Sequence, residues 1–150
     1  MYPPREEILA LAKGKTMDNS IGTWKLNVEK SKYTPAPLPF KSQSTIRSAA
    51  DGGVKVTSTG VQVDGKPSNS SYTVKYDGKD CPVTGAPFDT IAMKQVDANT
   101  LTITAKQAGG KFHATGQTVI SKDGKVLTTT VNGKDADGKA LSATLVYDKQ

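Results

Sequence analysis

The side chains that could do chemistry are few and scattered in this sequence. His113 is the only histidine and Cys81 the only cysteine among 150 residues, which excludes a three-histidine zinc site, a Cys-x-x-Cys pair and an intrachain disulfide. Lys79 is the only cation close to Cys81 in sequence, which favours a structural thiol over a nucleophile. The Gly-x-Ser-x-Gly motif of many serine hydrolases does not occur. The sequence therefore assigns no catalytic residue, and we expect no metal site and no cofactor.

Two further features have structural explanations. His113 alternates with Phe112 and Ala114, so if those two side chains face inward, His113 lies on the outer face. The run from Asp135 to Gly138 resembles the start of a calcium-binding loop, but the twelfth position, where such a loop needs glutamate, is Val146. We therefore interpret this run as a hairpin turn.

What remains is a group of aromatic side chains and one methionine, several of them alternating with polar residues. Aromatic rings and a flexible thioether suit a flat apolar molecule, and tyrosine hydroxyls can bind its polar end. The sequence thus predicts a cavity for a small hydrophobic or aromatic ligand, lined by Tyr72, Tyr76, Phe88, Met93, Phe112 and Tyr147. The alternative is that these side chains fill the interior completely.

Short strands are the elements that must position these residues. Between clusters of Asp, Gly and Asn, apolar residues alternate with Lys, Thr, Ser and Asn, which is typical of strands with one buried face. The glycines supply the positive φ that tight hairpins need. Turns are predicted at 51–53, 64–67, 77–80, 97–100, 109–111, 123–125 and 137–139. Strands are predicted at 22–27, 43–49, 53–63, 69–77, 79–84, 90–97, 100–107, 111–121, 125–133 and 139–148.

This pattern predicts an all-β fold, a single up-and-down antiparallel barrel of about 8 to 10 strands preceded by a short N-terminal helix. Closing the sheet buries the apolar face and removes the exposed edges. We expect the barrel at residues 18–150, after an N-terminal helix or leader at 1–17. Pro4 suits a first helical position and Gly14 a C-terminal cap, which places the helix at 4–14. Whether residues 1–16 are part of the native protein is left open.

Three prolines lie in the segment between the first two predicted strands. Pro35, Pro37 and Pro39 lack the backbone N–H that a sheet ladder needs. We expect residues 31–40 to form an extended loop across one mouth of the barrel, without sheet pairing.

The net charge of +6 comes from 18 lysines spread along the chain and only two arginines, Arg5 and Arg47. Nucleic-acid binding usually requires a focused basic face, so no nucleic-acid partner is expected. No run of 18 apolar residues occurs, so no membrane span is predicted. The expected partner is a small hydrophobic ligand, bound by a monomer or a homodimer.

Gly22-Thr-Trp24 opens the first predicted strand and resembles the signature that opens lipocalins and their calycin relatives. The resemblance implies that the glycine lets the chain bend into the barrel and that the tryptophan plugs its closed end, often under an arginine from the last strand. At that strand this sequence offers Lys139 and Lys149 but no arginine. The stacking partner is therefore absent or is supplied by Arg47.

The wider pattern over residues 20–148 resembles a group of small exported bacterial lipocalin-like proteins without assigned activity. It includes Lys30-Ser-Lys-Tyr33, Tyr76-Asp-Gly-Lys-Asp80 and Pro82-Val-Thr-Gly85. The resemblance implies a periplasmic or secreted protein. No signal peptide is visible, because Glu6 and Glu7 stand where a signal peptide is basic and then apolar.

Binding of a small hydrophobic or aromatic molecule is the function that these expectations favour. One alternative is a small barrel enzyme, a hydrolase, lyase or isomerase, that uses a cavity Tyr, Asp or Lys as acid or base. Another is an envelope protein that acts through its outer face.

Overall fold

The structure, a computed structural model, describes residues 20–35, 37–50 and 53–150. The predicted helix at 4–14, with the remainder of the segment 1–17, lies outside these residues, and so do Asp51 and Gly52 of the first predicted turn. The described residues contain no α-helix and are organised as β-strands joined by short turns. The all-β prediction is confirmed for this part of the chain.

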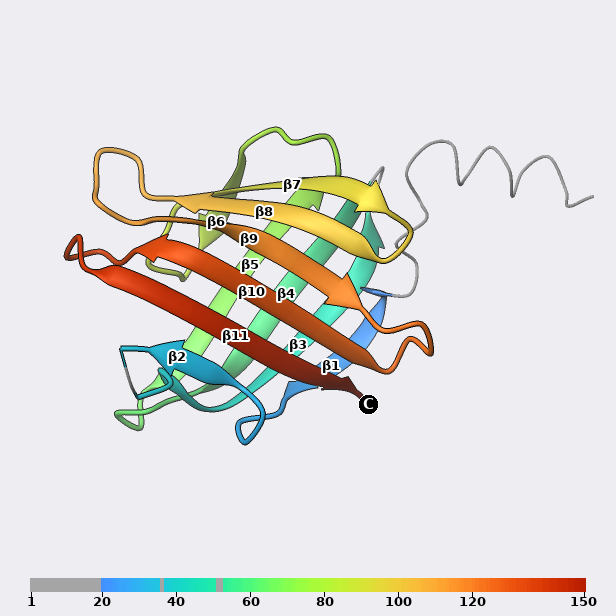
Figure 1. The fold of residues 1–150 in the computed structure, drawn as a ribbon, viewed down its shortest axis with the longest axis horizontal. Helices are drawn as coiled ribbons and strands as arrows, with labels where there is room; N and C mark the ends of the chain where they lie inside the picture. The colour runs from blue at the N-terminus through green and yellow to red at the C-terminus, as the bar shows by residue number, and fades with distance from the viewer. Residues whose placement is uncertain (1–19, 36, 51–52) are drawn as a thin grey trace, which may run out of the picture.

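Eleven strands form one antiparallel sheet (Figure 1). From β3 to β11 each strand pairs with the next one along the chain, and β1 pairs with both β3 and β11. Ten strands thus close into an up-and-down barrel, as predicted, and β2 adds to the edge of β11. The strands are β1 (Gly22–Leu26), β2 (Lys32–Thr34), β3 (Phe40–Ala50), β4 (Gly53–Gln62), β5 (Pro67–Lys75), β6 (Cys81–Thr84), β7 (Thr90–Asp97), β8 (Thr100–Lys106), β9 (His113–Ile120), β10 (Val126–Lys134) and β11 (Ala140–Lys149).

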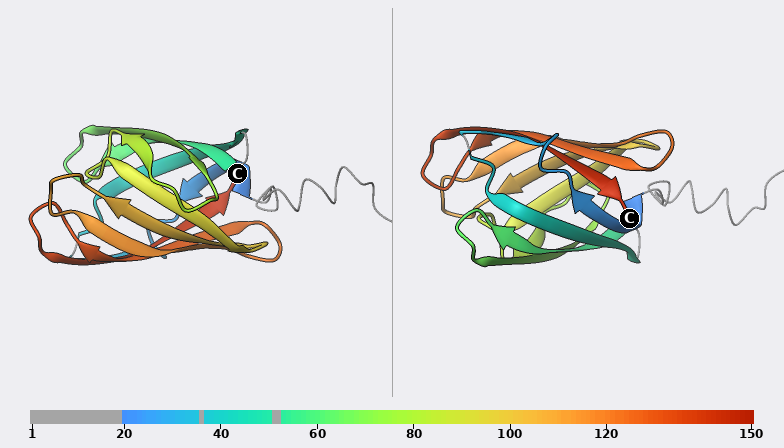
Figure 2. Two further views of the ribbon diagram at one scale, coloured as in Figure 1. Left: turned by 90° about the horizontal axis from the view of Figure 1, so that it is seen from above. Right: turned by 90° about the horizontal axis from the view of Figure 1, so that it is seen from below.

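The barrel closes where β1 lies beside the end of β11 (Figure 2). Only three residue pairs join these strands, from Trp24 opposite Lys149 to Leu26 opposite Tyr147. Beyond them, Asn27 N donates a hydrogen bond of 2.7 Å to Val146 O, and Val146 N donates one of 2.9 Å to Ser31 Oγ. A serine hydroxyl therefore continues the ladder where β1 ends.

The prediction of an unpaired loop at residues 31–40 is wrong at both ends, since Phe40 begins β3 and pairs with Gln62. Lys32–Thr34 forms β2 and pairs with Ser142–Thr144 of β11. The prolines begin only at Pro35, so residues 32–34 keep their N–H groups, and the short β1 leaves this stretch of β11 without a partner. Pairing with β2 satisfies the backbone groups that β1 does not reach.

The turns follow the predicted chemistry. Five of the glycines in the predicted turns have positive φ between +71° and +89°, namely Gly65, Gly78, Gly109, Gly124 and Gly138. Aspartates fix several of these turns, because their carboxylates accept backbone N–H groups two residues further on, as Asp64 does from Lys66 and Asp123 from Lys125. Asp135 likewise accepts from the backbone of Asp137 and Lys139, which confirms a hairpin turn there.

Trp24, on β1 opposite Lys149 of β11, is fully buried and lines one end of the cavity inside the barrel. Its Nε1 donates a hydrogen bond of 2.9 Å to Ser20 O, and Lys149 Nζ lies 5.7 Å from the ring centroid. The cation over the indole is thus a lysine from the end of β11, and Arg47 is not needed for this role. Gly22 has φ +138°, and a Cβ there would lie 3.0 Å from Lys149 Cε, so a side chain at residue 22 would be strained and crowded.

Replacing Trp24 with alanine should lower the free energy of unfolding by about 3 to 5 kcal/mol, since it removes a fully buried indole and leaves a cavity. Urea unfolding followed by circular dichroism would measure this. Ile46→Ala is the matched control, because Ile46 lies on the outer face of β3 with 54% of its surface exposed, and its loss should be nearly neutral. A cost for Trp24→Ala no larger than that of the control would contradict the plug at the closed end.

Candidate ligand-binding cavity

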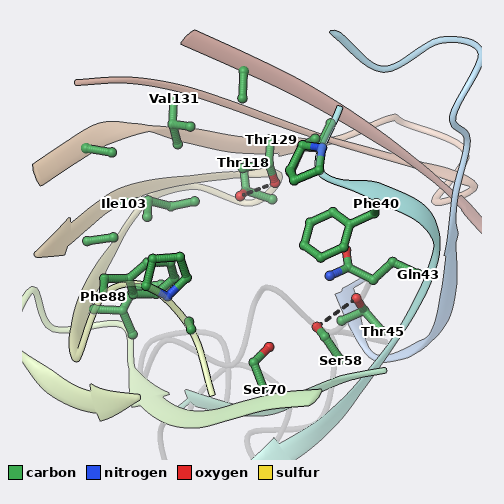
Figure 3. Close-up of a pocket in the computed structure, with 18 of the residues that line it drawn as sticks. Phe40, Gln43, Thr45, Ser58, Ser70, Phe88, Ile103, Thr118, Thr129 and Val131 are labelled. Atoms are coloured by element: carbon green, nitrogen blue, oxygen red, sulfur yellow. Dashed lines mark hydrogen bonds between the residues drawn. The ribbon is translucent and has the colours of Figure 1, made fainter. Parts of the chain in front are cut away.

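A cavity of about 480 Å³ lies inside the barrel (Figure 3). It is lined by inward-facing side chains of β1, β3–β5 and β7–β11, together with residues of β2 and of the loops before β3, β7 and β9. Leu141, Ala143, Leu145 and Tyr147 line it at every second position of β11, a span of roughly 20 Å along the strand. The predicted side chains therefore do not fill the interior.

One wall of the cavity is polar. It consists of eight inward-facing residues of three adjacent strands, Gln43, Thr45 and Arg47 of β3, Ser58 and Gln62 of β4, and Ser68, Ser70 and Tyr72 of β5. Thr45 Oγ1 and Ser58 Oγ are 3.0 Å apart, and the Tyr147 hydroxyl donates a hydrogen bond to Gln43 Oε1 from across the closure (Figure 3 shows the first pair). This wall can offer hydrogen bonds to the polar part of a ligand.

The opposite wall is mainly apolar. Its two inward hydroxyls, Thr118 Oγ1 and Thr129 Oγ1, lie 2.9 Å apart and satisfy each other (Figure 3). The other lining residues of β7–β11, Tyr147 apart, are Ile91, Met93, Ile103, Ala105, Ala114, Leu127, Val131, Leu141, Ala143 and Leu145. A ligand lying against this wall would be held by apolar contact.

Aromatic rings surround the cavity at the end opposite Trp24. Phe88, in the loop before β7, and Phe112, just before β9, have ring centroids 5.3 Å apart, tilted by 34°. Phe40, at the start of β3, faces the cavity from the other side (Figure 3). These half-buried rings define the entrance.

The deep end of the cavity combines two tyrosines with one buried cation. Arg47 is 6% exposed, and its guanidinium interacts electrostatically with the Tyr72 hydroxyl. Burial raises the pKa of the Tyr72 hydroxyl, and the Arg47 guanidinium opposes this shift. Burial also raises the pKa of Tyr147, an effect to which the neighbouring Tyr72 adds. Both hydroxyls are therefore neutral hydrogen-bonding groups at physiological pH.

The structure brings together five of the six residues predicted for the site. Tyr72, Phe88, Met93, Phe112 and Tyr147 line the cavity. Tyr76 does not, although it packs against the hydrophobic core. It follows the last residue of β5, beyond Tyr72 and Val74, and so lies past the floor of the cavity.

Sequence reasoning missed the polar wall. The signal was the alternation of Gln43, Thr45 and Arg47 with Ser44 and Ile46, but in this strand the polar residues face inward and the isoleucine faces solvent. His113 is exposed on the outer face, as expected, and Cys81 is half-buried with Sγ 3.7 Å from Lys79 O.

Two features are absent from residues 20–35, 37–50 and 53–150. Those residues include no group of three or more His, Cys, Asp or Glu side chains arranged to hold a metal ion. Within the same ranges, no helix has the length and hydropathy that crossing a membrane requires.

No known family model matches this sequence, and no curated protein is detectably similar to it. Solved structures do show the same fold. The S-type phycobiliprotein lyase CPES from Guillardia theta has a TM-score of 0.60 at 9% identity, over 99% of this chain and 98% of the lyase. Lipocalin 12 from rat epididymis has a TM-score of 0.54 at 12% identity, over 89% of this chain and 67% of the lipocalin chain. Zebrafish ileal bile acid-binding protein, complexed with cholic acid, has a TM-score of 0.51 at 13% identity, over 89% of this chain and 100% of the zebrafish protein.

These likenesses show a calycin-like fold, a ten-strand antiparallel barrel. The lipocalin-like fold implied by Gly22-Thr-Trp24 is thus confirmed at the level of structure.

The raised pKa of Tyr147 predicts an alkaline loss of stability. Because the folded chain keeps this hydroxyl neutral while the unfolded chain ionises it near pH 10, its contribution is fully present below about pH 10 and is lost as the pH rises towards the folded pKa. Tyr147→Phe should make the fall in unfolding free energy above pH 10 shallower by up to about 1.4 kcal/mol per pH unit. Urea unfolding at pH 8, 10 and 11 would measure this, and parallel falls for both proteins would contradict it.

Proposed function

We propose that this protein binds a small, mainly hydrophobic molecule inside the barrel. The observation that carries the proposal is the cavity of about 480 Å³ with one apolar wall and one polar wall. Ligand sites of proteins are typically concave, mostly apolar and equipped with a few polar groups that orient the ligand. The volume lies within the range of roughly 300 to 1,000 Å³ that such sites occupy.

The structural neighbours support a binding role. Calycin-type barrels commonly bind small hydrophobic ligands, and the zebrafish protein is complexed with cholic acid. The apolar wall of β7–β11 offers the same kind of surface, and the rings of Phe40, Phe88 and Phe112 border the way in. A ligand that buries apolar area here gains about 25 cal/mol per Å² before the cost of association.

An enzymatic role has weaker support in the cavity. Among the described lining residues there is no Asp, Glu, Lys or His. The pKa values of Tyr72 and Tyr147 are both raised, away from the neutral range where a general acid or base works best. The likeness to a lyase rests on the fold, with 9% identity. Binding without turnover is therefore the function that we propose.

The neutral dye N-phenyl-1-naphthylamine tests the proposal, since its fluorescence rises in an apolar site. We expect saturable binding to the protein. Ala114 lines the cavity and is 2% exposed, so Ala114→Phe should place a ring in the ligand volume and weaken dye binding at least about tenfold. Thr115→Phe adds the same ring to the exposed outer face of β9 and should leave the dye affinity unchanged. Equal effects of the two substitutions, or a dye that does not bind, would contradict a cavity site.

The native compartment belongs to the proposal as well. The resemblance to exported bacterial lipocalin-like proteins supports a periplasmic or secreted location, where the barrel would take up its ligand outside the cytoplasm. Fractionation of the cells that naturally produce the protein tests this, and retention in the cytoplasm would contradict it.

A further inference from the structure

The cavity contains a cation without a counter-ion among the described residues. Arg47 is more than nine-tenths buried, and of the described residues that line the cavity it is the only charged one. Its Nε and Nη2 atoms are buried and have no hydrogen-bond partner in the described part of the chain. A buried guanidinium normally has its N–H groups paired, because burying an unpaired charge is costly.

The neighbours of Arg47 explain why no described residue supplies a partner. Arg47 lies opposite Gly22 on β1 and Val56 on β4, and neither residue has a polar side chain. On its own strand the nearest inward-facing residue is Thr45, whose hydroxyl is engaged with Ser58. Among the described residues, the guanidinium interacts electrostatically with the neutral hydroxyls of Tyr72 and Tyr147, neither of which carries a counter-charge. Nε and Nη2 are therefore left without a partner among the described residues, and because both atoms are buried, a molecule in the cavity reaches them through a rotation of the Arg47 side chain.

The two unpartnered atoms also favour one kind of ligand group. Nε and Nη2 lie on one edge of the guanidinium plane, where a carboxylate can accept two parallel hydrogen bonds. A carboxylate carries one negative charge, which matches the single cation of the cavity. A phosphate monoester carries about 1.5 to 2 negative charges at neutral pH, more than this site neutralises. The Tyr72 hydroxyl, which interacts electrostatically with the same guanidinium, is a further polar group at this end.

We propose that the ligand is an elongated, mainly apolar carboxylic acid whose carboxylate binds Arg47 at the deep end of the cavity. The proposal rests on the binding function proposed above and adds the class and orientation of the ligand. The apolar body of the ligand lies along the wall of β7–β11, and its far end lies towards the rings of Phe88 and Phe112. The polar wall and the apolar wall then each have a distinct part of the ligand to contact.

Dodecanoate and dodecanol form the test pair, since they differ in the charged head group. Each is measured, below its solubility limit, by displacement of N-phenyl-1-naphthylamine from the protein. We expect Arg47→Met to weaken dodecanoate binding by about 10- to 100-fold, the usual effect of losing a buried charge-assisted pair. Dodecanol and the dye itself should change by less than about threefold, because methionine preserves the apolar volume. Dodecyl phosphate should bind the unaltered protein less tightly than dodecanoate.

Lys55→Met is the matched control. Lys55 lies on the exposed face of β4, next in the chain to Val56, the residue opposite Arg47, so this substitution removes the same charge from the outside of the barrel. It should leave all affinities unchanged, which separates a specific contact from the general attraction of a basic protein for anions.

Thermal unfolding provides a second readout that does not depend on the dye. Without ligand, Arg47→Met should unfold at a higher temperature than the unaltered protein, because the substitution removes a buried charge with unpaired N–H groups. Dodecanoate should raise the unfolding temperature of the unaltered protein more than that of the variant. If Arg47→Met does not fold, Arg47→Gln, which keeps a polar group without the charge, takes its place.

The outcomes separate the two proposals. Dodecanoate that binds Arg47→Met as tightly as the unaltered protein, while the dye and dodecanol also bind, overturns the carboxylate site and leaves the binding function intact. Tighter binding of dodecyl phosphate than of dodecanoate overturns the choice of a carboxylate. If neither the dye nor either amphiphile binds the unaltered protein, the binding function fails, and this inference fails with it.

Discussion

Closure of the sheet is the constraint on which the rest of this structure depends. Ten antiparallel strands form a barrel only if the first strand pairs with the last, and here β1 reaches only three residues of β11. The hydroxyl of Ser31 and the three residues of β2 form hydrogen bonds with the backbone groups of β11 that β1 does not reach. Once the edge is satisfied, alternate residues of every strand must face a common interior. The cavity is a consequence of that closure.

The interior has a polar wall and an apolar wall because neighbouring strands carry inward-facing side chains of similar polarity. Most inward positions of β3–β5 that line the cavity are serine, threonine, glutamine, arginine or tyrosine, and most of those of β7–β11 are aliphatic. A cavity filled by apolar side chains would add stability to a small domain, so an open interior with a buried arginine lowers the stability that the same fold could have. Such a cost is typical of positions kept for binding. The fully buried Trp24, with Lys149 over its ring, supplies compensating packing.

Local chemistry made the strands and turns predictable. An Asp-Gly pair specifies a turn through its own carboxylate and a positive φ, and Gly65, Gly78 and Gly124 adopt that conformation. Alternation predicted the buried faces of strands such as β8, where Leu101, Ile103 and Ala105 are buried. The pairing of β2 with β11 could not be predicted from the sequence. Residues 32–34 pair with a stretch of β11 that the short β1 leaves without a partner, and that stretch is defined only in the folded barrel. The polar wall was missed because Thr45 and Arg47 face inward while Ile46 faces solvent, the reverse of what hydrophobicity predicts.

The central claim is that the interior of this barrel holds the ligand. Methyl NMR spectra recorded while N-phenyl-1-naphthylamine is added would test it directly, because methyl groups are present both inside and outside the barrel. The account predicts shifts and intermolecular contacts at the inward methyl groups of Ile103, Val131 and Leu145, with those of the exposed Ile46, Val61 and Val96 unchanged. Shifts confined to Ile46, Val61 and Val96 would place the ligand on the outer surface and contradict the account.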